Sequence, residues 1–269
     1  MNFIKITEQP SIHEDLEQKS VRELLEGINE EDRKVASAVH ACIPQIEKLV
    51  NEIVERMHQG GRIFYLGLDA SEIPPTFGMP DTCVIGIIAG GEQALRRPVE
   101  NAEDDSQKGW MELQDHHITN KDILIGIAAS GTTPYVIGAL QKAREHGILT
   151  ASISSNPGSP LSSVTDIPIE MIVGPEFITG SSRMKSGTGQ KMILNMISTT
   201  VMIKLGRVKG NRMVNMQLSN RKLIDRGVQM LIDELHINKA EAKQLLQEQG
   251  SVKKALDAYK TNNCITKNN

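Results

Sequence analysis

Short apolar runs that alternate with helical segments constrain the fold of this chain more than any other feature. The candidate strands, which are nearly continuous in Val and Ile, lie at 62–67, 83–90, 122–130, 149–155 and 166–174. Such runs are typical of a parallel sheet that is covered on both faces. Helical patterns at 133–147 and 189–206 separate or follow them. The sequence therefore predicts a three-layer α/β domain.

Helical segments also stand at both ends of this sheet region. Residues 29–61 carry apolar side chains at helical spacing, which predicts one long amphipathic helix bent at Pro44. Beyond residue 218 the chain becomes charged and helical, with a polar tail at its end. We therefore expect a main domain with an N-terminal helical extension over 1–218, and a small helical subdomain over 219–269.

Charge, cysteines and hydropathy narrow the class of function. The formal net charge is −3, so the balance does not favour nucleic acid or an acidic membrane surface as a partner. The three scattered cysteines have no metal-ligand spacing and suit a reducing compartment. No run approaches the roughly 20 apolar residues that cross a bilayer, and the first residues do not resemble a signal peptide. We expect a soluble cytoplasmic protein with no metal.

The sharpest local motif is GIAASGTTPYVIGAL, residues 126–140. A buried strand runs into Ser130, Gly131, Thr132 and Thr133, and a helix follows from Pro134. Hydroxyls and free backbone N–H groups at a helix N-terminus can bind a phosphate without metal or lysine. The other interpretation is an ordinary helix cap, since Ser and Thr before Pro suit any helix start.

A second polar cluster, ITGSSRMKSGTGQK, precedes the apolar helix at 189–206. It contains Ser181, Ser182, Arg183 and Lys185. A basic, glycine-rich surface loop would account for it, but hydroxyls with two cations favour a ligand or subunit contact.

Two glutamates are candidates for acid–base chemistry. Glu72 lies in DASEIPP close to the end of the first strand, and Glu103 lies in ENAEDDSQKG. Taken alone, Glu72 would be a local cap and Glu103 part of a solvated acidic face. Pairing them as acid and base requires a geometry that the residues alone do not give.

Stretches along nearly the whole chain, among them DASEIPPTFG, GIIAGGEQAL, AEDD, GSSRMKSGT and GNRMVNMQLSN, resemble the N-acetylmuramic acid 6-phosphate etherases. These belong to the sugar isomerase (SIS) domain proteins, which include the glucokinase regulatory protein. The resemblance implies a flavodoxin-like SIS core, a homodimer, no cofactor, and cleavage of N-acetylmuramate 6-phosphate to N-acetylglucosamine 6-phosphate and D-lactate. It implies Glu72 as proton donor and Glu103 as the second catalytic carboxylate.

The same resemblance ranks the binding residues. Ser130, Gly131, Thr132 and Thr133 are expected to hold the phosphate, although the family usually has Arg where Thr132 stands. The four residues of the second cluster are ligand or dimer-interface candidates of second rank.

The reaction accounts for two glutamates. In the open-chain sugar C1 is an aldehyde, so a carboxylate can remove the C2 proton while an acid protonates the lactate oxygen that leaves C3. Water then adds across the double bond. One carboxyl must be charged and the other protonated, so their environments are expected to push their pKa values apart.

One departure from the family falls at Gly67. The family has a Thr-Ser-Gly-Arg type loop there, whereas here Leu68 follows directly. Either a phosphate-binding loop has been deleted, or a mobile loop is absent from the printed sequence, which we favour. A Gly67–Leu68 Cα separation well beyond about 3.8 Å would indicate the second.

Two rival functions use the same fold. A non-catalytic sugar-phosphate sensor, similar to the glucokinase regulatory protein, would suit the absent loop. An aldose–ketose isomerase would use related proton chemistry but leaves Glu72 and Glu103 without explanation.

Overall fold

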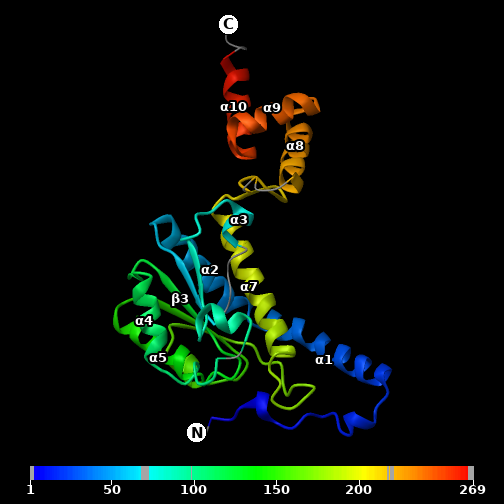
Figure 1. Ribbon diagram of the computed structural model, residues 1–269, viewed down its shortest axis with the longest axis vertical. Helices are drawn as coiled ribbons and strands as arrows, with labels where there is room; N and C mark the ends of the chain where they lie inside the picture. Colours follow the sequence, from blue (N-terminus) through cyan, green and yellow to red (C-terminus); the bar gives the residue numbers. More distant parts are fainter. Residues whose placement is uncertain (1–2, 68–72, 98, 217, 219–220, 266–269) are drawn as a thin grey trace. The chain divides into compact units, whose positions relative to one another are not determined.

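The computed structural model describes residues 3–67, 73–97, 99–216, 218 and 221–265 (Figure 1). By contacts these residues form two units, one within 1–70 and 84–201 and the other within 71–83 and 202–269. The expected domain limit at 218–219 borders residues outside the described ranges and stays a prediction.

A five-stranded parallel sheet forms the centre of the first unit. Its strands are β1 (Ile63–Leu66), β2 (Val84–Ile87), β3 (Ile123–Ile127), β4 (Leu149–Ser154) and β5 (Ile167–Glu170). The spatial order is β2-β1-β3-β4-β5, and every pair is parallel. The direction of winding reverses between β1 and β3, and ligands of open α/β sheets bind outside the strand ends at that point.

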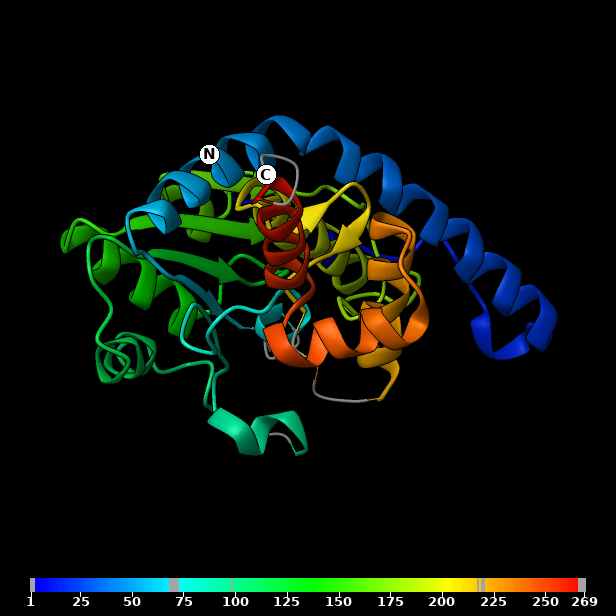
Figure 2. The same cartoon turned by 90° about the horizontal axis from the view of Figure 1, so that it is seen from above.

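Helices cover both faces of this sheet, which confirms the three-layer prediction (Figure 2). The helices of the first unit are η1 (Ile6–Glu8), η2 (Leu16–Gln18), α1 (Val21–Ala41), α2 (Ile43–His58), η3 (Gly91–Leu95), α4 (Lys108–Asp115), α5 (Pro134–Glu145), α6 (Pro160–Ser163) and most of α7 (Lys185–Lys204). The face with α4 and α5 contains a buried core that includes Phe64, Leu124 and Leu140. The face with α2 lies opposite (Figures 1 and 2).

The expected long helix is present as α1 and α2, with Pro44 in the first turn of the second helix. It begins at Val21, earlier than expected, because Ser20 and Glu23 form a capping box. The sequence pattern therefore predicted the bend correctly and missed the start.

The second unit joins two distant stretches of sequence. It contains α3 (Ile73–Phe77), β6 (Val208–Lys209), β7 (Arg212–Met213), α8 (Arg221–Leu235), α9 (Lys239–Gln249) and α10 (Val252–Ile265). Arg207 Nη1 donates a hydrogen bond to the Gly78 carbonyl at 3.4 Å, across 129 positions of sequence. The apolar core of this unit includes Leu231, Leu246 and Val252. Its three C-terminal helices, α8 to α10, agree with the helical segment expected from the sequence. Within the described chain, no helix is both long enough and apolar enough to span a membrane.

Candidate functional site

A cavity of about 260 Å³ lies at the carboxyl ends of β1 and β3, and we call it the switch-point pocket. It is lined by Gly67, which follows β1, and by residues 127–130, which are the last residue of β3 and the three that follow it. Its polar lining residues are Glu103, Ser130, Thr133, Tyr135, Ser182 and Gln190. The fold therefore brings one carboxylate and several hydroxyls together where the winding of the sheet reverses.

Ser130 is held in the pocket by a buried asparagine. The Asn156 amide nitrogen donates to the Ser130 carbonyl at 3.0 Å and to the Thr7 hydroxyl at 3.0 Å. The Thr7 N–H donates back to Asn156 Oδ1 at 3.1 Å. The N-terminal segment and the loop after β4 thus fix the backbone from which the Ser130 side chain projects.

The β3–α5 loop keeps its hydroxyls at the helix N-terminus. Thr133 is the N-cap of α5, but its side chain makes no capping hydrogen bond. Thr132 donates both its N–H, at 3.2 Å, and its hydroxyl, at 3.1 Å, to Ser130 Oγ. Gly131 lies between them in a left-handed conformation, with φ +69°. The arrangement leaves the Thr133 hydroxyl available to a ligand beside the positive end of α5.

Glu103 reaches the pocket because its backbone is tied to α5. The Tyr135 N–H donates to the Glu103 carbonyl at 3.0 Å, so an otherwise unpaired helix N–H holds the segment in place. The Glu103 side chain is exposed and lines the cavity. A carboxylate near the phosphate-binding candidates is what base catalysis on a sugar phosphate requires.

The second polar cluster divides between the pocket and the interior. Ser182 lines the pocket, Ser181 is partly buried, and Arg183 is exposed. Lys185 is 1% exposed, and its ammonium donates to Glu31 of α1 at 2.5 Å. Ser181, Arg183 and Lys185 are not among the residues that line the described part of the cavity.

A buried carboxylate caps the start of α7. Glu176 accepts the Lys185 N–H at 2.9 Å, and the Ser186 N–H and hydroxyl at 3.0 and 2.8 Å. A negative charge at a helix N-terminus is favourable, and here it fixes the helix that carries Gln190.

Glu31 is the centre of a charged cluster that links α1 to α7. Its carboxylate also accepts from Lys34 at 2.6 Å and contacts the His13 ring at 3.2 Å. Burial alone would raise the pKa of Glu31, but the hydrogen bonds from Lys185, Lys34 and His13 outweigh burial and lower it to about 2. Glu31 therefore stays ionised and keeps the buried lysine paired.

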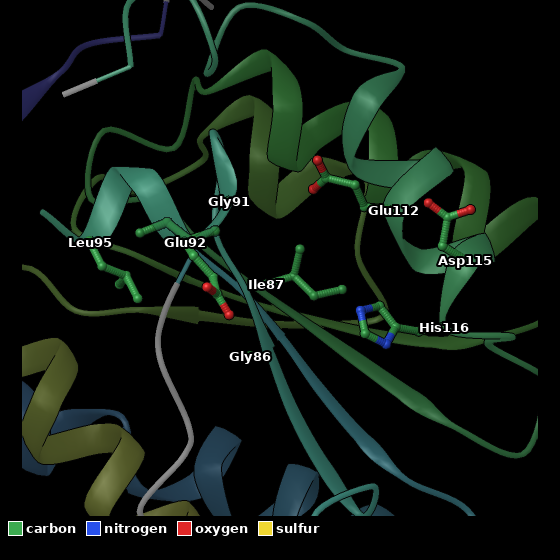
Figure 3. Close-up of a pocket in the computed structure, with 9 residues that line it drawn as sticks. Gly86, Ile87, Gly91, Glu92, Leu95, Glu112, Asp115 and His116 are labelled. Atoms are coloured by element: carbon green, nitrogen blue, oxygen red, sulfur yellow. The ribbon is translucent and has the colours of Figure 1, made fainter. Parts of the chain in front are cut away.

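A larger cavity, of about 390 Å³, lies along the edge strand β2 (Figure 3). This cavity is lined by Glu92 of η3 and by three residues later in the chain, Glu112, Asp115 and His116. Among the described residues, no cluster of three or more acidic, His or Cys side chains is arranged to hold a metal ion. We take the smaller pocket as the candidate site because it lies at the ends of the strands where the winding reverses.

Tyr135 connects the two cavities. It lines the switch-point pocket, and its hydroxyl donates to Glu112, which lines the larger cavity. Burial, together with the Glu112 carboxylate, raises the pKa of Tyr135, so the phenol keeps its proton.

Two sequence expectations cannot be placed, since Glu72 and Leu68 lie outside the described residues. The shared site of Glu72 with Glu103 and the Gly67–Leu68 separation therefore stay predictions. Three pocket-forming residues were missed, namely Tyr135, Asn156 and Gln190. Gln190 lies within the second polar cluster, but a neutral amide at the start of an apolar helix does not by itself indicate a pocket residue.

Comparisons with known proteins identify the fold and the family of this chain. Residues 34–144 match the glucokinase regulatory protein N-terminal SIS domain family, and residues 95–200 match the SIS domain family. A phosphoheptose isomerase structure from Francisella tularensis matches with a TM-score of 0.53 at 16% identity, covering 69% of this chain and all of that one. That likeness concerns the fold alone.

Sequence relatives are much closer. An N-acetylmuramic acid 6-phosphate etherase of Bacteroides fragilis is 70% identical over 268 residues, covering 96% of this chain and 95% of that protein. One from Porphyromonas gingivalis is 65% identical over 267 residues, covering 96% and 97%. The alignment with the Bacteroides fragilis protein has 268 positions but covers only 96% of this 269-residue chain. Some positions of that protein therefore have no counterpart in this chain.

Proposed function

The chain belongs to the N-acetylmuramic acid 6-phosphate etherases, and from that membership we propose that it cleaves the lactyl ether of N-acetylmuramate 6-phosphate. The products are N-acetylglucosamine 6-phosphate and D-lactate. The observation that carries the proposal is a carboxylate, Glu103, in one pocket with the Ser130, Thr133 and Ser182 hydroxyls.

The reaction is an elimination followed by addition of water. Glu103 takes the C2 proton of the open-chain sugar, and the electrons of that C–H bond form a C2–C3 double bond as the C3–oxygen bond breaks. Glu72, assigned by family resemblance, protonates the departing lactate oxygen. Water then adds its hydroxyl to C3 and its proton to C2, so no redox partner is needed.

Phosphate binding is assigned to the start of α5. The hydroxyls of Ser130 and Thr133, with the helix dipole, suit a phosphate dianion. Thr132 and Gly131 shape the loop, and Ser182 supplies a further hydroxyl from the side of α7. Ser181, Arg183 and Lys185 lie outside this set of contacts, and Lys185 acts through its pairing with Glu31.

The regulatory alternative has less support. The model of the regulatory protein's SIS domain matches only residues 34–144, whereas relatives named as etherases match nearly the whole chain. A sensor would bind sugar phosphate without releasing lactate.

A homodimer is part of the proposal. Helix α1 extends beyond the sheet (Figure 2), and Val21 and Leu25 on it are 74% and 62% exposed. Together with Ile28 they form an apolar stripe at helical spacing, which a second copy of the chain would cover. The phosphorylated substrate, which does not cross membranes unaided, suits a cytoplasmic location.

Lactate release from N-acetylmuramate 6-phosphate tests the catalytic proposal. Glu103→Gln should abolish release and stop exchange of the C2 proton with solvent, because the amide cannot accept that proton. Glu100→Gln, at an exposed neighbouring position, is the matched control and should behave as the parent. Exchange at the parent rate in Glu103→Gln would assign the base to another residue.

A further inference from the structure

The segment before α1 contacts two loops that form walls of the switch-point pocket. Residues 3–20, dark blue in Figure 1, contain the sequence ITEQPS at positions 6–11, which no step of the proposed reaction uses. One of the two loops is the β3–α5 loop, which carries Ser130, and the other is the loop before α7, which carries Ser182. The contacts span between 149 and 168 positions of sequence. One short segment therefore holds two separate parts of the site.

The first contact runs from Thr7 to the Ser130 backbone through Asn156. Thr7 is 1% exposed and Asn156 is fully buried, so water does not replace the hydrogen bonds between them. The Asn156 amide nitrogen donates to the Thr7 hydroxyl and to the Ser130 carbonyl, each at 3.0 Å. In a buried network each group orients the next. Thr7 therefore fixes the amide that holds the phosphate-binding loop.

The second contact runs from Ser11 to the loop that carries Ser182. The Ser11 N–H donates to the Thr179 hydroxyl at 2.9 Å, and the Ser11 hydroxyl donates to the Phe177 carbonyl at 2.8 Å. Ser182 follows in the same loop, and its N–H donates to the Gly180 carbonyl at 2.9 Å in a tight turn. The position of the Ser182 hydroxyl is thus tied to the same segment as that of Ser130.

We propose that residues 6–11 set the spacing between the Ser130 and Ser182 hydroxyls for the phosphate, with Thr7 and Ser11 as positioning residues for substrate binding. The inference rests on the proposed function, because it takes the phosphate assignment from it. Neither Thr7 nor Ser11 is among the residues that line the described part of the pocket, so both act through the loops. Groups that are held in place before the ligand arrives bind it more tightly, because less freedom is lost on binding.

The test is calorimetric binding of N-acetylglucosamine 6-phosphate to the full chain, together with steady-state lactate release. Thr7→Val keeps the side-chain shape and removes the hydroxyl that Asn156 contacts. Its Kd and KM should rise about tenfold, equivalent to about 1.4 kcal/mol, while kcat is retained, because phosphate contacts are present throughout the reaction. Thr7→Ser restores the hydroxyl and should bind as the parent does. Ser11→Ala should raise Kd and KM in the same direction as Thr7→Val.

A control separates positioning from stability. Val39 of α1 is buried, so Val39→Ala should lower the midpoint of thermal unfolding and leave Kd unchanged. Kd is measured at a temperature at which circular dichroism shows every variant to be folded. Gln9→Ala, at an exposed position of the same segment, should change neither quantity. If Thr7→Val does not fold, Ser11→Ala, at a partly exposed position, decides the test.

The outcomes distinguish this inference from the proposed function. A parent-like Kd in either folded variant would overturn the role of that residue, and an equal rise in Val39→Ala, or a fall in kcat with KM unchanged, would overturn both roles. Lactate release by the parent would leave the etherase proposal intact in each case. A parent that binds the sugar phosphate without releasing lactate would overturn the proposed function alone, since Kd still decides the role of the segment. A parent that does neither would overturn both.

Discussion

The carboxylate of Glu31 controls whether Lys185 can be buried. The two charges meet across 154 positions of sequence, from α1 to the first residue of α7. A lysine among serines and glycines indicates a surface or ligand role, and nothing near it in sequence points to Glu31. Burial of Lys185 could not be predicted, because it depends on a partner that only the folded chain brings close.

Glu31→Gln should lower stability and change its response to acid. Because the folded-state pKa of Glu31 is lowered to about 2, its stabilisation is complete above the ordinary value of 4.5 and is lost as pH falls towards 2. The shift corresponds to roughly 3 kcal/mol. At pH 7 the variant should lose about 3–5 kcal/mol, since a buried ammonium remains unpaired.

Urea unfolding at a series of pH values, followed by the fluorescence of the single tryptophan, Trp110, measures this effect. Glu26→Gln, at an exposed position of the same helix, is the control. If Glu31→Gln showed the same loss of stability between pH 4.5 and 2 as the parent, Glu31 would not be the group responsible.

At the scale of elements, apolar periodicity predicted most of what the structure contains. All five strands and the helices at 133–147 and 189–206 are present, because buried parallel strands and apolar helices have distinct patterns. The starts of helices were less predictable. Helix α7 begins at Lys185 because the carboxylate of Glu176, from a preceding loop, caps it. Only tertiary structure supplies such a cap.

Helix α5 approaches the segment that carries Glu103 so closely that only glycine fits at position 138. A Cβ on Gly138 would lie 1.9 Å from the Ser106 carbonyl oxygen. Gly138→Ala should therefore displace the Glu103 segment and reduce kcat by about a hundredfold. The loss of stability from overpacking should be about 1–3 kcal/mol.

Steady-state lactate release and thermal unfolding measure the two effects. Gln141→Ala, at an exposed position of the same helix, should change neither. Parent-like kcat in Gly138→Ala would mean that Glu103 tolerates this displacement.

At the scale of the whole molecule, motifs in order along the chain identified the family, and near-complete matches to named etherases confirm it. The gathering of Glu103, Ser130, Thr133 and Ser182 in one pocket follows from parallel strands ending at one edge of the sheet. Neither Gln190 nor Tyr135 could be recognised from sequence as a pocket residue, because that depends on which helix faces the pocket.

The proposed dimer should depend on the exposed apolar stripe of α1. Leu25→Glu places a charge in the expected interface, so we expect the dimer to dissociate while the helical content is retained. Sedimentation equilibrium of the parent, Leu25→Glu and the control Glu30→Gln measures this. A monomeric parent, or a variant that stays dimeric, would exclude this interface.

If Gly67 and Leu68 are joined directly in the protein, the phosphate-binding loop of the family has been deleted and sugar-phosphate binding should be weaker. Each charge-assisted hydrogen bond is worth about 1.5–3 kcal/mol, so losing one or more should raise the Kd for N-acetylglucosamine 6-phosphate by about tenfold or more relative to the Bacteroides fragilis protein. Calorimetry on both proteins compares them directly. Equal affinities would show that no phosphate donor has been lost.

The second unit is assembled from stretches that leave the ribosome at very different times. Gly78, whose carbonyl accepts from Arg207, is synthesised 129 positions before that arginine. At about 5–20 residues per second, the nascent segment around Gly78 waits on the order of ten seconds for its partner. Residues 73–83, with the apolar Phe77 and Met79, therefore stay uncovered through much of translation, a period in which chaperones can bind them.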